Sequence, residues 1–377
     1  MKLRRIWAVA RKESLHVLRD WRSMLMAIAI PVLQIVLFGW ALTLDVDRVP
    51  LSVWDRSQSP ASRDFTALFS GSRYFFLNPP ADEYADIVRA IDARHAMLAL
   101  VIPEDFAQKL AAGKPCSVQC IADGTDSNTA TLALGYAESL VNTYNQNLAL
   151  NLIQRAGLTP PSMPIEPNPR VWFNEDLESK NNIIPGIIAV IMSMIAALLT
   201  SLTIAREWEH GTMEQLASTP VSEAELVLGK FFPYFLLGMF NMTLAVCLGA
   251  FVFEVPLRGN VFLLFSVSAV FLFVALAQGM LIGIVTRNQL LASQGALLIT
   301  FLPAFLLSGF AFAISNMPAA LQYVTYVVPA RYFVTLLKGI YLKGVGLDVL
   351  GLEAALLALY CVILLGLCVA LFKKKMR

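Results

Sequence analysis

Residues 205–230 read AREWEHGTMEQLASTPVSEAELVLGK, a short charged stretch that separates two long apolar runs. The runs, residues 181–205 and 231–253, are each long enough to cross a bilayer, which takes about 20 residues of helix. The stretch between them therefore predicts a brief water-facing connection between two membrane-spanning helices.

Turn and cap residues divide this connection. Gly211 interrupts the exit from the preceding helix, and Thr212 with Gln215 three residues later forms a capping-box pattern. The pattern predicts a short helix over residues 213–218, which Pro220 ends. From the pattern alone, an ordinary capped turn with a solvated acidic face and a docking element for a partner explain the stretch equally well.

The connection resembles the cytoplasmic coupling-helix motif of type-two ABC exporter permeases. The residues that carry the resemblance are Arg206, Glu207, Glu209, Gly211, Thr212, Met213, Glu214, Leu216, Thr219 and Pro220. It implies that residues 206–222 contain a coupling helix that contacts a separate ATP-hydrolysing subunit. It further implies that the three carboxylates pair with basic groups on that subunit, that Met213 and Leu216 enter its apolar cleft, and that Gly211 allows close approach.

Composition places the chain among membrane proteins. Hydrophobic residues make up 57% of its 377 residues and charged residues only 15%, with a mean hydropathy of +0.63. The net charge of +2 is too small to indicate a nucleic-acid partner.

The apolar runs predict an α-helical integral membrane protein with six membrane-spanning helices. The predicted spans are residues 23–44, 183–205, 228–253, 260–286, 289–312 and 353–372. The uncharged run over residues 288–330 is too long for one helix and is interrupted by prolines and by Gly309. We therefore expect a re-entrant segment over residues 316–341 after the fifth span.

Residues 1–22 predict an amphipathic helix that lies in the membrane interface. Its apolar side includes Leu3, Trp7 and Trp21, and basic residues occupy the rest of its surface. A secretory signal peptide is the competing interpretation, but its basic and apolar regions are too long and no convincing cleavage site follows. Both chain ends are basic, which predicts that both are cytoplasmic and that the number of spans is even.

Residues 45–180 have the composition of a soluble domain inserted between the first two spans, and the span count predicts that it is extracytoplasmic. Strand patterns alternate with helical ones, which predicts an α/β fold. The predicted strands are residues 51–54, 74–77, 97–102 and 117–121, the predicted helices are residues 61–69, 81–96, 104–112 and 129–156, and a proline-rich linker covers residues 159–169. Cys116 and Cys120 need a turn between them to form a disulfide, so their bonding stays open.

The sequence contains no P-loop motif, so the chain is not expected to hydrolyse ATP, and it shows no pattern of catalytic residues or metal ligands. The central portions of the spans carry no Asp, Glu, Lys or Arg apart from Lys230 near one end, which argues against proton-coupled transport. Polar residues in the spans are candidates for a translocation path, although helix packing explains them equally well. These candidates are Gln34, Asn241, Gln278, Gln294 and Ser308.

We interpret the chain as the permease subunit of an inner-membrane ATP-binding-cassette exporter that moves an amphipathic, drug-like or lipid-like cargo. The resemblance implies a separate ATPase subunit that binds ATP and Mg, and a dimer with a second copy or a paralogous permease in the lipid bilayer. Residues 170–177 are similar to a segment found in a permease subgroup with a large extracytoplasmic insertion; a periplasmic adaptor stays an open question. The alternative class is a non-transporting receptor or anchor.

Overall fold

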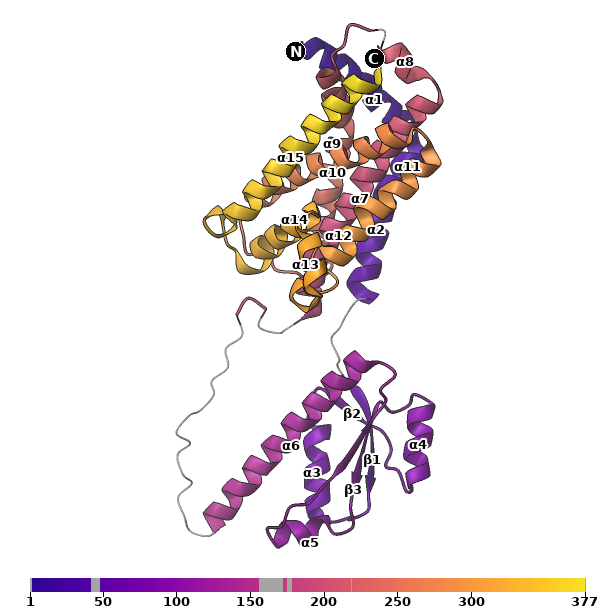
Figure 1. Cartoon of the computed structure of the whole chain (residues 1–377). Helices are drawn as coiled ribbons and strands as arrows, with labels where there is room; N and C mark the ends of the chain where they lie inside the picture. Colours follow the sequence, from indigo (N-terminus) through magenta and orange to yellow (C-terminus); the bar gives the residue numbers. More distant parts are fainter. Residues whose placement is uncertain (1, 42–47, 156–171, 175–177, 218, 377) are drawn as a thin grey trace. The chain divides into compact units, whose positions relative to one another are not determined.

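The computed structural model describes residues 2–41, 48–155, 172–174, 178–217 and 219–376. The chain forms two compact units, and each has its own hydrophobic core (Figure 1). The helical unit comprises Met1–Thr43 and Val171–Arg377, and the α/β unit comprises Leu44–Arg170.

The α/β unit is built on a four-stranded sheet with the strand order β2-β1-β3-β4. Strands β1 (Val49–Asp55), β2 (Phe75–Leu77) and β3 (Leu98–Ile102) are parallel, whereas β4 (Gln119–Ala122) pairs antiparallel with β3. Every residue of β3 is buried, as expected for a central strand that is covered on both faces. The strands occupy the regions that the sequence predicts.

Helices cover both faces of this sheet. α3 (Pro60–Ser70) and α6 (Ser127–Arg155) pack on one face, and α4 (Tyr84–Asp92) packs on the other (Figure 1). A short helix, α5 (Phe106–Ala111), follows β3. Each of these helices falls within or next to a helix that the sequence predicts.

The helix predicted over residues 81–96 is longer than the observed α4. Its start is delayed because the Ala81 N–H donates to the Val53 carbonyl oxygen and so continues the sheet. Its end is early because Arg94 adopts a left-handed φ of 58°, which no α-helical residue has. The predicted linker, residues 159–169, lies outside the described residues.

Six helices in the described ranges are long and apolar enough to cross a membrane, judged by length and composition. They are α2 (Trp21–Ala41), α7 (Ser179–Glu209), α9 (Glu223–Phe251), α10 (Val261–Thr286), the continuous run of α11 (Gln289–Ala296), a π-helical turn (Leu297–Phe301) and α12 (Leu302–Leu307), and α15 (Leu347–Met376). Each predicted span coincides with one of them. The fifth ends before the predicted residue 312, because Gly309 turns the chain with a φ of 82°.

α7 is the centre of the helical unit. Most of its residues are buried, and it packs against α2, α9, α10 and α14 (Pro329–Lys338). Small residues allow the close contact with α10, because a Cβ added at Gly279 would lie 2.1 Å from Thr200 Oγ1 and 2.3 Å from the Ala197 carbonyl oxygen. Thr200 Oγ1 also donates to the Leu276 carbonyl oxygen at 3.1 Å.

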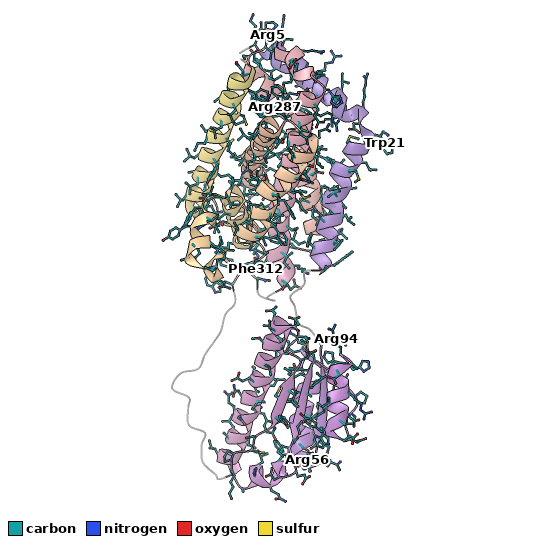
Figure 2. All side chains as sticks on the ribbon, turned by 45° about the vertical axis from the view of Figure 1, so that its right-hand side comes forward. Arg5, Trp21, Arg56, Arg94, Arg287 and Phe312 are labelled. Atoms are coloured by element: carbon teal, nitrogen blue, oxygen red, sulfur yellow. The ribbon has the colours of Figure 1, made fainter. Side chains whose placement is uncertain are left out.

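The two ends of the helical unit carry different short helices. α1 (Leu3–Arg19), α8 (Thr212–Ala217) and the C-terminal end of α15 lie at one end (Figure 1). The other end carries α13 (Ala319–Thr325) and α14, whose 7 and 10 residues are too few to cross a bilayer. Figure 2 labels Arg5 at the first end and Phe312 at the second. The predicted re-entrant segment, residues 316–341, thus consists mainly of short helices.

The predicted single helix over residues 1–22 ends at Arg19. Asp20 leaves the helical region with a ψ of 68°, and Trp21 already begins α2 and lies on the outer surface of the unit (Figure 2). α1 keeps an apolar surface, because Leu3, Trp7 and Leu18 are each more than 60% exposed. This surface is the one that the sequence assigns to the membrane interface.

The close contact between α7 and α10 predicts that one added methyl group lowers the stability of the helical unit. Gly279→Ala should destabilise the helical unit by about 1–3 kcal/mol, because its Cβ meets backbone atoms that cannot move aside. Gly366→Ala in α15 is the matched control, since a Cβ there meets nothing within 4 Å. Thermal unfolding of the two purified variants measures the difference, and equal melting temperatures would contradict the packing argument.

Candidate functional site

The connection between α7 and α9 contains one short helix, as predicted. α7 ends when the His210 N–H donates to the Arg206 carbonyl oxygen, and Gly211 reverses the chain with a φ of 69°. α8 follows at Thr212–Ala217, within one residue of the predicted helix over 213–218. A Cβ added at Gly211 meets nothing within 4 Å, so space does not require a glycine here. The left-handed backbone conformation does, because it costs a residue with a Cβ about 1–2 kcal/mol.

α8 has a buried side and an exposed side. Met213 is only 1% exposed and belongs to the core of the helical unit, and Leu216 packs against the same core. Glu214 and Gln215 are exposed. The expectation that Met213 enters a cleft on a partner therefore differs from the structure, in which this chain already surrounds it.

Four charged side chains form a cluster beneath the connection, which we call the ion cluster: Lys12 and Glu13 of α1, Glu207 of α7 and Lys230 of α9. Lys230 Nζ lies 3.1 Å from Glu13 Oε1 and 2.5 Å from Glu207 Oε2. Lys12 Nζ lies 2.9 Å from Glu207 Oε1 and 3.1 Å from Glu13 Oε1. The side chains of Lys230 and Glu13 are each only 2% exposed, so their charges depend on this pairing.

The ion pairs shift the titration of the two α1 residues. Burial raises the pKa of the Glu13 carboxyl, but the pairs with Lys230 and Lys12 outweigh it, and the net pKa is lowered. Burial lowers the pKa of Lys12, but the pairs with Glu207 and Glu13 outweigh it, and the net pKa is raised. Glu13 therefore contributes stability above its unfolded pKa of about 4.3, and this contribution is lost as the pH falls through the lowered folded pKa.

The N-terminal end of α1 is joined to the start of α9. Glu225 accepts hydrogen bonds from the Ser222 N–H at 3.0 Å, as part of a capping box at the start of α9, and from the Lys2 N–H at 2.6 Å. Gly229 lets the helices approach, because a Cβ there would lie 2.7 Å from Val9 Cβ. α1 is thus fixed to α9 along much of its length.

The end of α7 is joined to the start of α11. Glu209 accepts hydrogen bonds from the Gln289 N–H at 2.8 Å and from Gln289 Nε2 at 2.5 Å. Arg206 Nε donates to Gln289 Oε1 at 3.3 Å, and the Arg287 guanidinium lies 4.2 Å from the Trp208 ring centroid. Glu209, expected to pair with a partner, therefore already holds two helices of this chain together.

The predicted coupling residues differ in where their side chains lie. Glu207 and Met213 face into the chain, Arg206 and Glu209 connect helices, and Glu214 and Pro220 are exposed. Lys12 and Glu13 were not predicted as site residues from the sequence. The sequence contains one indication of the cluster, because Glu13 is the only acidic residue among the first 19.

The candidates for a translocation path do not line one cavity. Asn241 lines a space of about 20 Å³ between α2, α7, α9 and α10, which holds little more than one water, and its Nδ2 donates to the Ala27 carbonyl oxygen at 3.0 Å. Gln34, Gln278, Gln294 and Ser308 are absent from its lining. Gln34 Nε2 contacts Met194 Sδ at 3.8 Å, and Gln294 lies on the outer surface. Their role in transport stays a prediction.

The described residues contain no group of three or more His, Cys, Asp or Glu side chains that could hold a metal ion. What the site presents instead is a short exposed helix fixed on a bundle of long apolar helices. A bundle of helices that are long and apolar enough to cross a membrane defines the chain as a membrane protein.

Comparison with known proteins identifies the family. Residues 21–370 match the ABC-2 family transporter protein, and the chain belongs to this family. It is the membrane permease subunit of an ABC transporter. Family membership decides against the receptor or anchor class that the sequence left as the alternative.

Several relatives are similar over most of the chain. The probable multidrug ABC transporter permease YbhS of Escherichia coli strain K12 is 39% identical over 342 residues, which are 90% of this chain and 89% of the relative. The probable multidrug ABC transporter permease YbhR of the same strain is 30% identical over 92% of both chains. The inner membrane transport permease YhhJ is 27% identical over 80% of this chain and 78% of the relative.

The ion cluster predicts that its two lysines contribute unequally to stability. Lys230→Met should destabilise the helical unit by about 3–5 kcal/mol, because it leaves buried carboxylates without their partner. Lys12→Met should cost within about 1 kcal/mol, because the Lys12 side chain is 52% exposed. Adding Glu13→Gln to Lys230→Met should restore part of the loss. Thermal unfolding checks all three variants, and similar losses for the two lysine variants would refute the cluster's role.

Proposed function

We propose that this permease subunit works in an exporter in which a separate ATPase subunit binds ATP and Mg and docks on the exposed side of α8. The observation that carries the proposal is the division of α8 into two sides. Met213 holds the helix in the core of the helical unit, while the side chain of Glu214 is exposed. A docking helix needs both a buried and an exposed side. If no side chain packed it against the core, a partner could displace the helix without moving the other helices of the bundle.

The ion cluster explains how motion at α8 would reach the spans. The Thr212 hydroxyl donates to the Glu207 carbonyl oxygen at 3.3 Å, and Glu207 is paired with Lys230 of α9. Glu209 holds the first turn of α11. A displacement of α8 by the ATPase would therefore pull on α7, α9 and α11 together. This is the coupling that the sequence motif implies.

Cargo and assembly belong to the same proposal. The printed names of two relatives describe multidrug permeases, which supports an amphipathic, drug-like or lipid-like cargo for this chain. The cavity lined by Asn241 is far too small for such a cargo. A path between two permease copies, or between this chain and a paralogue, would provide the room. Whether a periplasmic adaptor takes part stays an open question.

For the topology we propose six spans in the inner membrane, cytoplasmic termini, and an extracytoplasmic α/β unit. α1, α8 and the C-terminal end of α15 lie at one end of the helical unit, which supports a common side for both termini and the docking helix (Figure 1). Basic residues in α1 favour the cytoplasm for that side.

The topology predicts opposite labelling of two serine positions. In a variant without the five native cysteines, Ser127→Cys at the start of α6 should react with a membrane-impermeant maleimide in intact cells. Ser222→Cys at the start of α9 should react only after the cells are opened. Both serines are exposed, so a difference reports the side of the membrane. Reversed labelling would overturn the proposed orientation.

The docking role of α8 predicts the effect of one charge reversal. Glu214→Lys should weaken the complex with the ATPase by about 2–3 kcal/mol, or about 30- to 150-fold in dissociation constant, because the exposed carboxylate faces the partner. Asp92→Lys in the α/β unit is the control, since it makes the same charge change at another exposed position. Co-purification and titration of the ATPase measure the result. Equal affinity of both variants would remove α8 from the interface.

A further inference from the structure

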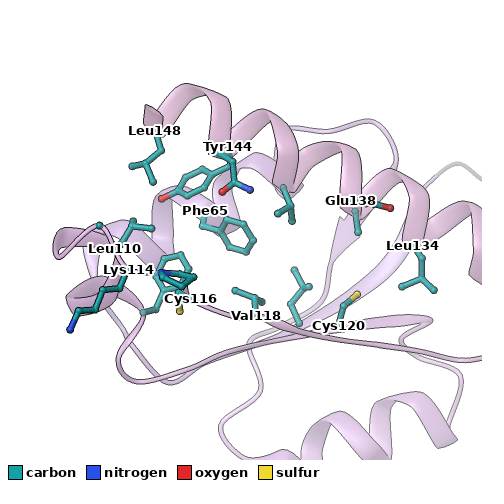
Figure 3. A pocket seen from close by; sticks show the side chains of 17 residues that line it. Phe65, Leu110, Lys114, Cys116, Val118, Cys120, Leu134, Glu138, Tyr144 and Leu148 are labelled. Carbon is teal, nitrogen blue, oxygen red and sulfur yellow. The ribbon is translucent and has the colours of Figure 1, made fainter. Parts of the chain in front are cut away.

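The α/β unit contains a groove of about 810 Å³ between α6 and the free edge of the sheet (Figure 3). β4 is the last strand of the sheet, and α6 crosses above it without covering it. Side chains of β3, β4, α3, α5 and α6 all contribute to the lining. Nothing in the proposed function uses this space.

The interior of the groove is apolar. Phe65 of α3, Leu134 of α6 and Val118, which directly precedes β4, point toward it (Figure 3). Leu134 is 40% exposed, and the exposed strand residue Cys120 lies beside it. Apolar surface left in water costs about 25 cal/mol per Å², so a soluble unit gains stability when such a groove is filled.

The polar groups lie at the rim. Lys114 and Glu138 occupy opposite ends of the groove in Figure 3, and Asn145 also borders it. The apolar surface is therefore confined to the hollow and does not extend over a flat face. A flat apolar face would suit a second copy of the chain, whereas a hollow with a polar rim suits a small molecule.

We propose that this groove is a binding site for a drug-sized, mainly apolar small molecule. Ligand sites of this kind enclose about 300–1,000 Å³ and combine an apolar lining with a few polar groups, as the groove does. The inference goes beyond the proposed function, because binding here involves neither α8 nor an ATPase. It gives the α/β unit a role in holding cargo-like molecules on the water-facing part of the chain.

Two cysteines make the groove accessible to measurement. Cys116 and Cys120 are both free thiols and both line it. The apolar surroundings raise the pKa of the Cys120 thiol to about 11, so its reaction with maleimides needs alkaline conditions. Cys247 is also exposed but belongs to α9 in the helical unit, so it serves as an internal control.

The experiment measures protection of these thiols by a probe. Full-length protein in detergent, kept reduced, is treated with N-ethylmaleimide at alkaline pH with increasing N-phenyl-1-naphthylamine, a neutral aromatic probe, and each labelled peptide is quantified. Labelling of Cys116 and Cys120 should slow in a saturable way, about tenfold when the probe is at ten times its Kd. Labelling of Cys247 should not change. Because no ATPase is present, failure here leaves the docking proposal untouched.

Variants inside and outside the groove test whether the probe binds in it. Val118→Trp should fill the groove, and Leu134→Glu should place a charge in its wall without disturbing the core, so both should abolish the protection of Cys116. Val88→Trp on the opposite face of the sheet should keep it, since Val88 is exposed and remote from the lining. Equal protection of Cys247, protection that never saturates, or unchanged protection in both groove variants would overturn the proposal. So would crosslinking of two chains through Cys120, which would show that a second copy fills the groove.

Discussion

The pairing of Lys230 with Glu13 and Glu207 is the constraint on which the helical unit depends. Lys230 and Glu13 are almost completely buried, and a buried charge is tolerated only while its partners stay in place. The pairs join α1, α7 and α9, so these helices must pack together. We infer that the charges select one arrangement among apolar helices whose hydrophobic surfaces alone would allow several.

The same constraint extends to α8. α8 follows α7 after a single reversal at Gly211, and Met213 fixes it to the core that the ion cluster supports. The two sides of α8 therefore differ. Its buried side connects it to the spans, and its other side is exposed.

The α/β unit depends instead on how its helices cover the sheet. Parallel strands β1 and β3 are buried because α3 and α4 cover the two faces of the sheet. At β4 the sheet ends in an antiparallel edge strand, and α6 alone lies above it. Apolar side chains of α6 and of the segment that leads into β4 consequently line an open groove.

Local patterns in the sequence determined the long helices, the strands and the short helix after Gly211, because hydropathy and turn residues act over a few positions. The family motif likewise lies in one continuous stretch. Only the tertiary structure decided that Glu207 and Met213 face inward and that Glu209 caps α11. Glu13 lies 217 residues from Lys230, and no local pattern records a pairing across that separation. Which side chains meet depends on how whole helices pack, and packing is a property of the folded chain.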